Sequence, residues 1–323
     1  MIERSIKLVG QSAHGARISG GALREALKLL VDGCQRALRM RAEGRSAARG
    51  PVPSWIVRST AFDVELRAGS TLLAVHTPTL KEADPEQFRQ ATLLGDLDPN
   101  LTAVDYLSSS LDAALGNSID RWAFDRSMLA ALRRDLKDLF GEGITAFAIP
   151  LVAPGAGELH VSPGDLSRLS RLERQIPPEQ AVRVAGKLDT IRHSDVTFAL
   201  FVGDSTEALR GVSDRQQVER LQGLWGKPVV VTGIAHFTPD GGIQLLEAES
   251  IEAASATDLE IWGARPQSFE RIQEGTGSLR VAHESTAHLR VAQGPRSGVN
   301  AIFGQWPGDE SDEEVERAVE ALS

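Results

Sequence analysis

The stretch Val182–Arg192, which reads VRVAGKLDTIR, decides the fold of the second half of the chain together with Lys227–His236, KPVVVTGIAH. Both stretches contain several β-branched residues and are long enough to cross a small sheet. Each also carries one glycine in its interior, Gly186 in the first and Gly233 in the second. A glycine inside a strand marks a bend or a bulge. We therefore expect both strands to curl, as strands of a small barrel do.

The sequence around these two stretches predicts the rest of a barrel. Further strands are expected at Thr197–Val202, Ala208–Val212 and Ile243–Ile251, with a helix at Asp214–Leu224. A Pro-Asp-Gly-Gly turn at 239–242 leads into the last strand. The order of three strands, a helix and two strands resembles that of an oligonucleotide/oligosaccharide-binding (OB) barrel. We assign this OB-like barrel to residues 178–263; a fold by itself does not define a function.

The first 177 residues mix helices and strands without regular alternation. Helices are expected from Ser19 to about Glu43, from Thr102 onward, from about Asp120 to Phe140, and from Ser162 to about Gln175. Strands are expected at Ile6–Val9, Phe62–Leu66, Leu72–Val75 and Ile144–Ile149. Because repeated βαβ units are missing from this order, we predict an α+β domain at residues 1–177. Ile176-Pro177-Pro178 marks the boundary with the barrel, so the whole chain is expected to be an α+β protein.

The composition is typical of a globular protein, with 41% hydrophobic and 24% charged residues over 323 positions. The N-terminus has no continuous apolar segment, and no run of about 18 apolar residues occurs elsewhere, so we expect no membrane span. The single cysteine, Cys34, fits a reducing compartment, and we expect a cytoplasmic protein. Cys34 falls in register with leucines of the first expected helix, which favours packing over reactivity.

Charge is unevenly distributed along the chain. Residues 1–60 contain eleven cations and four acids, which gives this segment a net charge of +7. Gly304–Ser323 contains seven carboxylates and one cation, and so holds −6 of the total charge of −9. The basic end favours either a phosphate-binding surface or a surface that attracts an acidic tail.

The last twenty residues read GQWPGDESDEEVERAVEALS. Ser311 and Glu314 have the spacing of a capping box, so we expect an acidic amphipathic helix from about Asp312 to the end. Val315, Ala318, Val319 and Leu322 recur at helical spacing and form one narrow apolar stripe. A helix of this length is not stable alone in water, so it must fold either against its own domain or against a partner. Residues 264–305, rich in Gly, Ser and Thr, are expected to be a flexible linker or a single hairpin.

The segment from Trp306 to Glu314, with the helix that follows, resembles the C-terminal tails of antitoxin-type proteins encoded next to PIN-domain ribonuclease toxins. The resemblance implies a tail, residues 306–323, that binds a cognate toxin and blocks its Mg²⁺-dependent active site. An acidic helix can mimic the charge of RNA there, with the tryptophan as an apolar anchor. The residues expected to contact the toxin are Trp306, Pro307, Asp309, Glu310, Glu313, Glu314, Val315, Arg317, Val319 and Leu322.

Enzymatic chemistry finds little support in the sequence. Neither a phosphate-binding glycine loop nor a nucleophile elbow is present, and the seven histidines lack metal-ligand spacing. We therefore expect no enzyme activity, no cofactor and no metal. An alternative function is nucleic-acid binding by the barrel and the basic N-terminal region. Residues 181–265 carry eight cations and twelve acids, and this net negative charge opposes phosphate binding. The residues that would form a local basic patch are Lys187, Arg192, Lys227 and His236.

Overall fold

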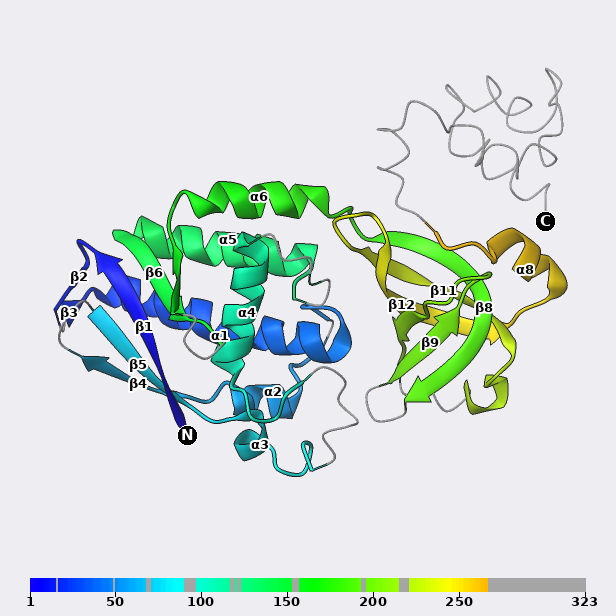
Figure 1. Ribbon diagram of the computed structural model, residues 1–323, viewed down its shortest axis with the longest axis horizontal. Coiled ribbons are helices and arrows are strands. Elements are labelled where there is room, and N and C mark those ends of the chain that lie inside the picture. Colours follow the sequence, from blue (N-terminus) through cyan, green and yellow to red (C-terminus); the bar gives the residue numbers. More distant parts are fainter. Residues whose placement is uncertain are drawn as a thin grey trace, which may run out of the picture. The chain divides into compact units, whose positions relative to one another are not determined.

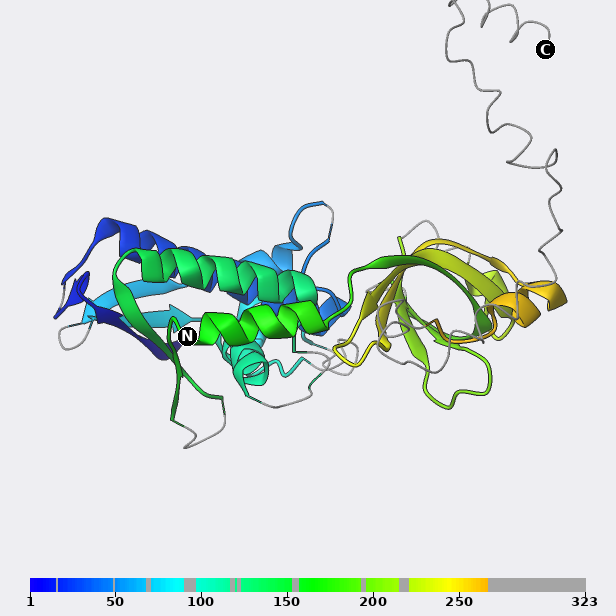
Figure 2. The same cartoon turned by 90° about the horizontal axis from the view of Figure 1, so that it is seen from above.

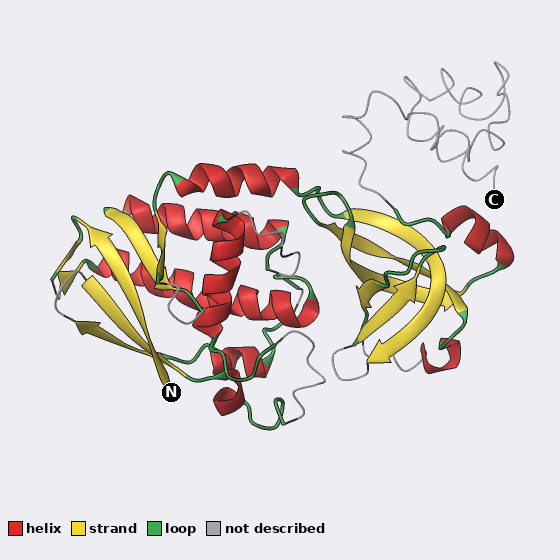
Figure 3. Ribbon diagram, viewed as in Figure 1, coloured by secondary structure: helices red, strands yellow, loops and turns green. Residues whose placement is uncertain are grey.

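The computed structural model describes residues 1–266, apart from short gaps at 16, 49, 68–70, 90–96, 117–119, 121–122, 153–156, 193–195 and 215–220. The described residues belong to one compact unit, Met1–Arg271. They form a mixed α+β structure with two sheets, the second of which is a closed five-stranded barrel (Figures 1 and 3). The expected α+β class and the barrel are therefore confirmed. The expected C-terminal helix, and all but the first few residues of the expected linker, lie outside the described residues.

The first sheet contains seven of the described strands. They are β1 (Ile2–Gly10), β2 (Ala13–His14), β3 (Arg17–Ile18), β4 (Asp63–Arg67), β5 (Thr71–Thr77), β6 (Ile144–Pro150) and β7 (Glu158–Val161). The strand order is β3-β2-β1-β5-β4, and β6 pairs with both β1 and β7. All these pairings are antiparallel. The expected strands at Phe62–Leu66 and Leu72–Val75 correspond to β4 and β5, and the expected strand at Ile144–Ile149 corresponds to β6.

Helices pack beside this sheet and against one another. They are α1 (Gly20–Glu43), α2 (Ser54–Ser59), α3 (Leu80–Ala83), α4 (Ala103–Leu115), α5 (Arg126–Gly141) and α6 (Asp165–Gln175). α1 contacts both α4 and α5, and α5 contacts α6; Figure 2 shows α1, α5 and α6 running side by side. Their apolar faces and those of β1, β5 and β6 share one core. None of the described helices is long and apolar enough to cross a membrane.

Capping residues set the ends of these helices. The Ser19 side chain accepts a hydrogen bond from the Ala22 amide at the start of α1, and Gly44 ends the helix in the left-handed conformation with φ 78°. Thr102 opens α4 with a capping box, as expected. The expected start of α5 near Asp120 is wrong, because the side chain of Asp125 is the cap and accepts from the Met128 amide.

The start of α6 also differs from the expectation. Ser162 was expected to cap a helix beginning at Pro163, but the helix begins at Asp165. The reason is a tight turn in which the Asp165 amide donates to the Ser162 carbonyl at 3.0 Å. The Asp165 carboxylate in turn accepts from the amide and hydroxyl of Ser162, both at 2.9 Å. The predicted end of this helix at Gln175 is confirmed.

The barrel consists of β8 (Gln180–Arg192), β9 (Thr197–Phe201), β10 (Leu209–Val212), β11 (Pro228–Phe237) and β12 (Ile243–Ala253). The closed strand order is β10-β12-β11-β8-β9. β10 and β12 pair in parallel, whereas the other neighbours pair antiparallel. Five strands closed in this way are compatible with the OB-like barrel expected from the sequence. Where a helix was expected before β11, the described residues contain the 3₁₀ turn η2 (Gln222–Leu224).

Two glycines allow the barrel strands to approach each other closely. A Cβ atom at Gly186 would lie 2.3 Å from the Phe201 carbonyl oxygen, and one at Gly233 would lie 2.0 Å from the Glu247 carbonyl oxygen. The register of β11 also shifts between Thr232 and Gly233. Both positions therefore require glycine, as the sequence indicated.

Three short helices of the described structure, α2, α3 and α8 (Ala256–Trp262), were not predicted from the sequence. α8 follows the barrel, begins with a capping box formed by Ser255 and Asp258, and contacts β8 and β11. None of its residues is buried. The guanidinium group of Arg183 lies 5.7 Å from the centre of the Trp262 ring and 3.4 Å from the Asp258 carboxylate, so a cation–π contact and an ion pair attach this helix to β8.

Candidate functional site

The residues expected to bind a toxin all lie in the segment 306–323, outside the described residues. The candidate sites that the structure describes are on the barrel and in the first domain.

The structure brings Lys187 and Lys227 together. Pro228, the first residue of β11, pairs with Lys187 of β8, and the Leu188 amide donates to the Lys227 carbonyl at 3.1 Å. Both lysines are exposed. The Lys227 ammonium donates to the Gly223 carbonyl at 2.8 Å, so its position is fixed by the turn that precedes β11. Two cations therefore lie close together in the barrel, Lys187 in the interior of β8 and Lys227 just before β11.

A tryptophan that the sequence analysis missed lies next to these lysines. Trp225 is the most exposed large apolar side chain among the described residues, at 68%. Its indole N–H donates to the Asp189 carbonyl at 2.6 Å, and the Gly226 amide donates to the Leu188 carbonyl at 2.8 Å. These bonds hold the ring at the surface. We call Lys187, Trp225 and Lys227 the Trp225 patch, and its chemistry, an exposed π surface close to two exposed cations in the fold, suits a base and its phosphates.

His236 is placed apart from this patch. It lies eight residues beyond Pro228 on β11, about 26 Å at 3.3 Å per residue, and is 8% exposed. Its Nδ1 is 3.3 Å from a Glu179 oxygen and its Nε2 is 3.5 Å from a Glu247 oxygen. Two carboxylates therefore occupy the surroundings of His236, which makes it a poor phosphate ligand. Arg192 is part of β8, but its side chain lies outside the described residues.

Glu247 is the centre of a small charged cluster. The pKa of its carboxyl group is lowered to about 2, because His236 and then Arg45 stabilise the charged form against the opposing effect of desolvation. The Arg45 guanidinium lies 2.7 Å from one carboxylate oxygen. The His236 contact is at the long end for a hydrogen bond. Opposite charges thus balance one another within this cluster, which leaves little attraction for a ligand.

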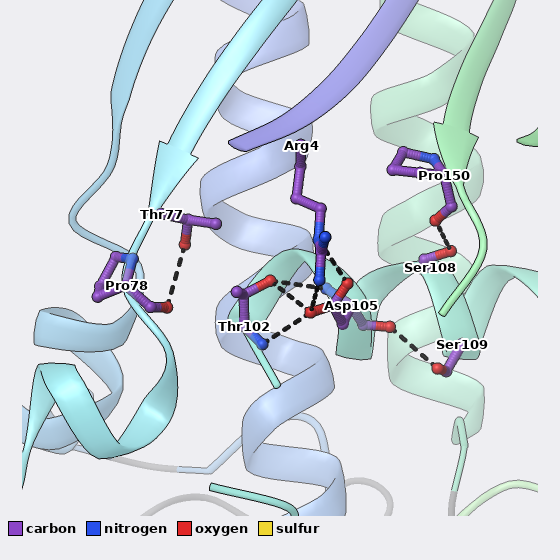
Figure 4. Close-up of polar contacts among 8 residues, drawn as sticks. All are labelled: Arg4, Thr77, Pro78, Thr102, Asp105, Ser108, Ser109 and Pro150. Carbon is purple, nitrogen blue, oxygen red and sulfur yellow. Dashed lines mark hydrogen bonds and ion pairs between the residues drawn. The ribbon is translucent and has the colours of Figure 1, made fainter. Parts of the chain in front are cut away.

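A second polar region joins α4 to the first sheet (Figure 4). The side chain of Asp105 is 2% exposed, and its two carboxylate oxygens lie 2.8 Å from two guanidinium nitrogens of Arg4. The same carboxylate accepts from the amide and hydroxyl of Thr102, both at 2.8 Å. Ser108 donates to the Pro150 carbonyl at 2.7 Å, which attaches α4 to β6. Because the carboxylate's partners are all protein groups, we interpret this region as structural.

A polar cavity of about 260 Å³ lies in the first domain between α1 and the segment that follows it. Asp32, Gln35, Arg36 and Arg39 line one wall, and Ser46, Ala47, Ala48, Gly50 and Val52 line the other. Elsewhere in the described part of the chain, no group of three or more His, Cys, Asp or Glu side chains is arranged to hold a metal ion.

Comparison with known proteins gives no family for this chain. No family model matches the sequence, and no curated protein matches it. Any functional assignment therefore depends on the residues themselves.

Proposed function

We propose that the protein is an antitoxin-like inhibitor that binds a PIN-type ribonuclease through residues 306–323. The observation that carries this proposal is the sequence of the tail, in which seven carboxylates follow one aromatic anchor, Trp306. A ribonuclease of this class attracts RNA with cations around a carboxylate-held metal ion. A carboxylate-rich helix competes for those cations by mimicking the charge of the RNA backbone.

The tail divides into parts with different roles. Asp309, Glu310, Glu313 and Glu314 supply charge, and Val315, Val319 and Leu322 supply an apolar stripe. Trp306 would fill an apolar pocket next to Pro307, as aromatic anchors do at the centre of interfaces. Arg317, the one cation, would pair with the metal-binding carboxylates of the enzyme. The two folded domains would then present the tail and set the specificity for the toxin.

The test is inhibition of a PIN-type ribonuclease, measured with a fluorogenic RNA. The full chain should abolish cleavage at stoichiometric concentration, and deletion of Gly304–Ser323 should remove inhibition. Trp306→Ala should weaken inhibition at least tenfold, as loss of a hot-spot residue does. Trp225→Ala, which removes an exposed tryptophan from the barrel, is the matched control and should inhibit normally. Full inhibition by the truncated chain would refute the proposal.

The Trp225 patch favours a second candidate, single-stranded nucleic-acid binding by the barrel. An exposed tryptophan whose indole N–H is held by the Asp189 carbonyl, with two lysines close to it in the fold, can stack one base and contact two phosphates. The rest of the barrel is net negative, so binding must be weak and local. Two phosphate contacts predict that log K falls with log salt with a slope of about −1.4.

This candidate is tested by titrating labelled single-stranded RNA into the full chain at two salt concentrations. Trp225→Ala and Lys187→Gln should each weaken binding several-fold, whereas Trp306→Ala should leave it unchanged. The two tryptophan variants therefore separate the two functions. No binding at low salt, or equal binding by Trp225→Ala, removes the nucleic-acid function and leaves the first proposal untouched.

A further inference from the structure

The polar cavity of the first domain is lined by one face of a helix. Asp32, Gln35, Arg36 and Arg39 occupy positions i, i+3, i+4 and i+7 of α1, and so lie on one side of it. The opposite wall is held in place at Ser46, which is 3% exposed. Its amide and hydroxyl both donate to the Asp125 carboxylate at 2.6 Å. The cavity is therefore built on a rigid helix and an anchored segment.

Arg39 is an unusual lining residue because it is a buried cation. The residue is 8% exposed, and its Nε atom is buried without a hydrogen-bond partner among the described residues. Its remaining contacts are long, with Nε 3.3 Å from a Glu43 oxygen and Nη2 3.4 Å from the Pro51 carbonyl oxygen. Burying a charge is costly unless it is paired and hydrogen-bonded, so this guanidinium has unused capacity for an anion.

Glu43 only partly neutralises Arg39. Its second carboxylate oxygen lies 3.2 Å from Arg45, which also pairs with Glu247 at 2.7 Å, so the charge of Glu43 is divided between two cations. On the other side of Arg39, one turn earlier, Arg36 is half-buried and has no ion pair or hydrogen bond within the described part of the chain. Two arginines on the same wall therefore lack a full set of acceptors, and like charges at this spacing repel each other.

We propose that this cavity binds a small molecule that carries a carboxylate or phosphate group. The planar forks of Arg36 and Arg39 match the two oxygens of such a group. A volume of about 260 Å³ lies just below the range of drug-sized pockets, so it fits a small metabolite. This site is independent of the proposed toxin-binding tail.

Asp32 determines which chemical group the ligand must carry at the end opposite its carboxylate or phosphate. It lies one helical turn before Arg36 on the cavity wall and has no ion pair or hydrogen bond among the described residues. A carboxylate only accepts hydrogen bonds, so it requires a hydroxyl or an amine on the ligand. It also disfavours a second acidic group at that end, because like charges in one site repel. The ligand class is therefore a small hydroxy or amino acid, or a phosphate ester of similar size.

The test is calorimetric titration of the full chain with glycerol 3-phosphate and with lactate, against chloride at the same ionic strength. We expect one site per chain. Arg36→Gln should weaken binding of both probes at least tenfold, and Arg39→Lys, which keeps the charge but loses the planar fork, should weaken it several-fold. Arg24→Gln is the matched control on the same helix, since Arg24 is 72% exposed, and it should bind as the wild type does.

Asp32→Asn distinguishes specific binding in the pocket from non-specific electrostatic attraction of anions. It should weaken glycerol 3-phosphate binding but leave inorganic phosphate binding equal or stronger, because it removes one negative charge. Should Arg39→Lys fail to fold, Arg36→Gln decides alone, since Arg36 is half-exposed and unpaired in the described structure. Binding no tighter than that of chloride, or equal losses in Arg36→Gln and Arg24→Gln, would overturn the proposal. Deletion of Gly304–Ser323 should not change the affinity.

Discussion

Cys34 lies in the core of the first domain with no exposed surface. Burial, and to a smaller extent the nearby Asp105 charge, raises the pKa of its thiol well above the usual range. Because the thiolate is the reactive form, Cys34 should not react with a disulfide reagent such as DTNB while the protein is folded. Labelling should become complete in denaturant. Rapid stoichiometric labelling under native conditions would show that this part of the core opens.

Asp105 should contribute more to stability than any exposed acid on the same helix. Asp105→Asn removes the charge that compensates Arg4 while keeping the shape of the side chain. Breaking a buried ion pair in this way costs about 3 kcal/mol in the free energy of unfolding, which urea denaturation can measure. Asp112→Asn changes an exposed residue of α4 and should cost less than about 0.5 kcal/mol. Similar losses for both variants would contradict the structural role assigned to Asp105.

The residues of the Trp225 patch show what the sequence can and cannot predict about a site. Lys187, Arg192, Lys227 and His236 were predicted to form one basic patch, and the structure brings Lys187 and Lys227 close together through the pairing of β8 with the start of β11. His236 was grouped with them only because the register was unknown, and antiparallel pairing puts it at the other end of β11. Trp225 was missed because its exposure depends on a contact with the Asp189 carbonyl, which no local pattern encodes.

Gly233 is the position in the barrel strands at which we expect a substitution to destabilise the protein most. Gly233→Ala would put a methyl group 2.0 Å from the Glu247 carbonyl oxygen of the neighbouring strand, so β11 and β12 would have to separate locally. We expect a loss of about 2 kcal/mol or more, in the range of overpacked cores. Gly223→Ala adds a methyl group where no atom lies within 4 Å and is the control. Equal melting temperatures for the two variants would contradict the close approach described for this bend.

The elements themselves were predicted unevenly, for physical reasons. α1 and α4 have strong side-chain caps and continuous apolar faces, so their starts were predicted within a residue or two. The start of α5 was misplaced because Asp120 and Asp125 are both plausible caps, and only tertiary packing selects Asp125. α8 was missed because its seven residues include no buried position, so the apolar periodicity that predicts a helix is absent.

The charge cluster around Glu247 predicts how the whole unit responds to acid. Its pKa is about 2 in the folded state, below the ordinary value for a glutamate of about 4.3. A lowered folded-state pKa stabilises the folded protein above the unfolded pKa, and this contribution is lost as the pH falls from about 4.3 towards 2. Its size is modest because the side chain is 39% exposed. Glu247→Gln should therefore lose less stability than the wild type between pH 5 and pH 3 in thermal melts, and identical pH profiles would contradict this assignment.

Closure of the barrel restricts how other molecules can attach to it. Each strand from β8 to β12 has a hydrogen-bonded neighbour on both sides, so an incoming extended peptide finds no free backbone there to extend the sheet. In the described structure, β4 lies at one end of the first sheet, and one of its two edges has no paired strand. That strand alternates charged residues, Asp63, Glu65 and Arg67, which is how proteins discourage unwanted strand pairing. A partner of the barrel must therefore recognise side chains and loops, whereas β-strand addition is confined to the first domain.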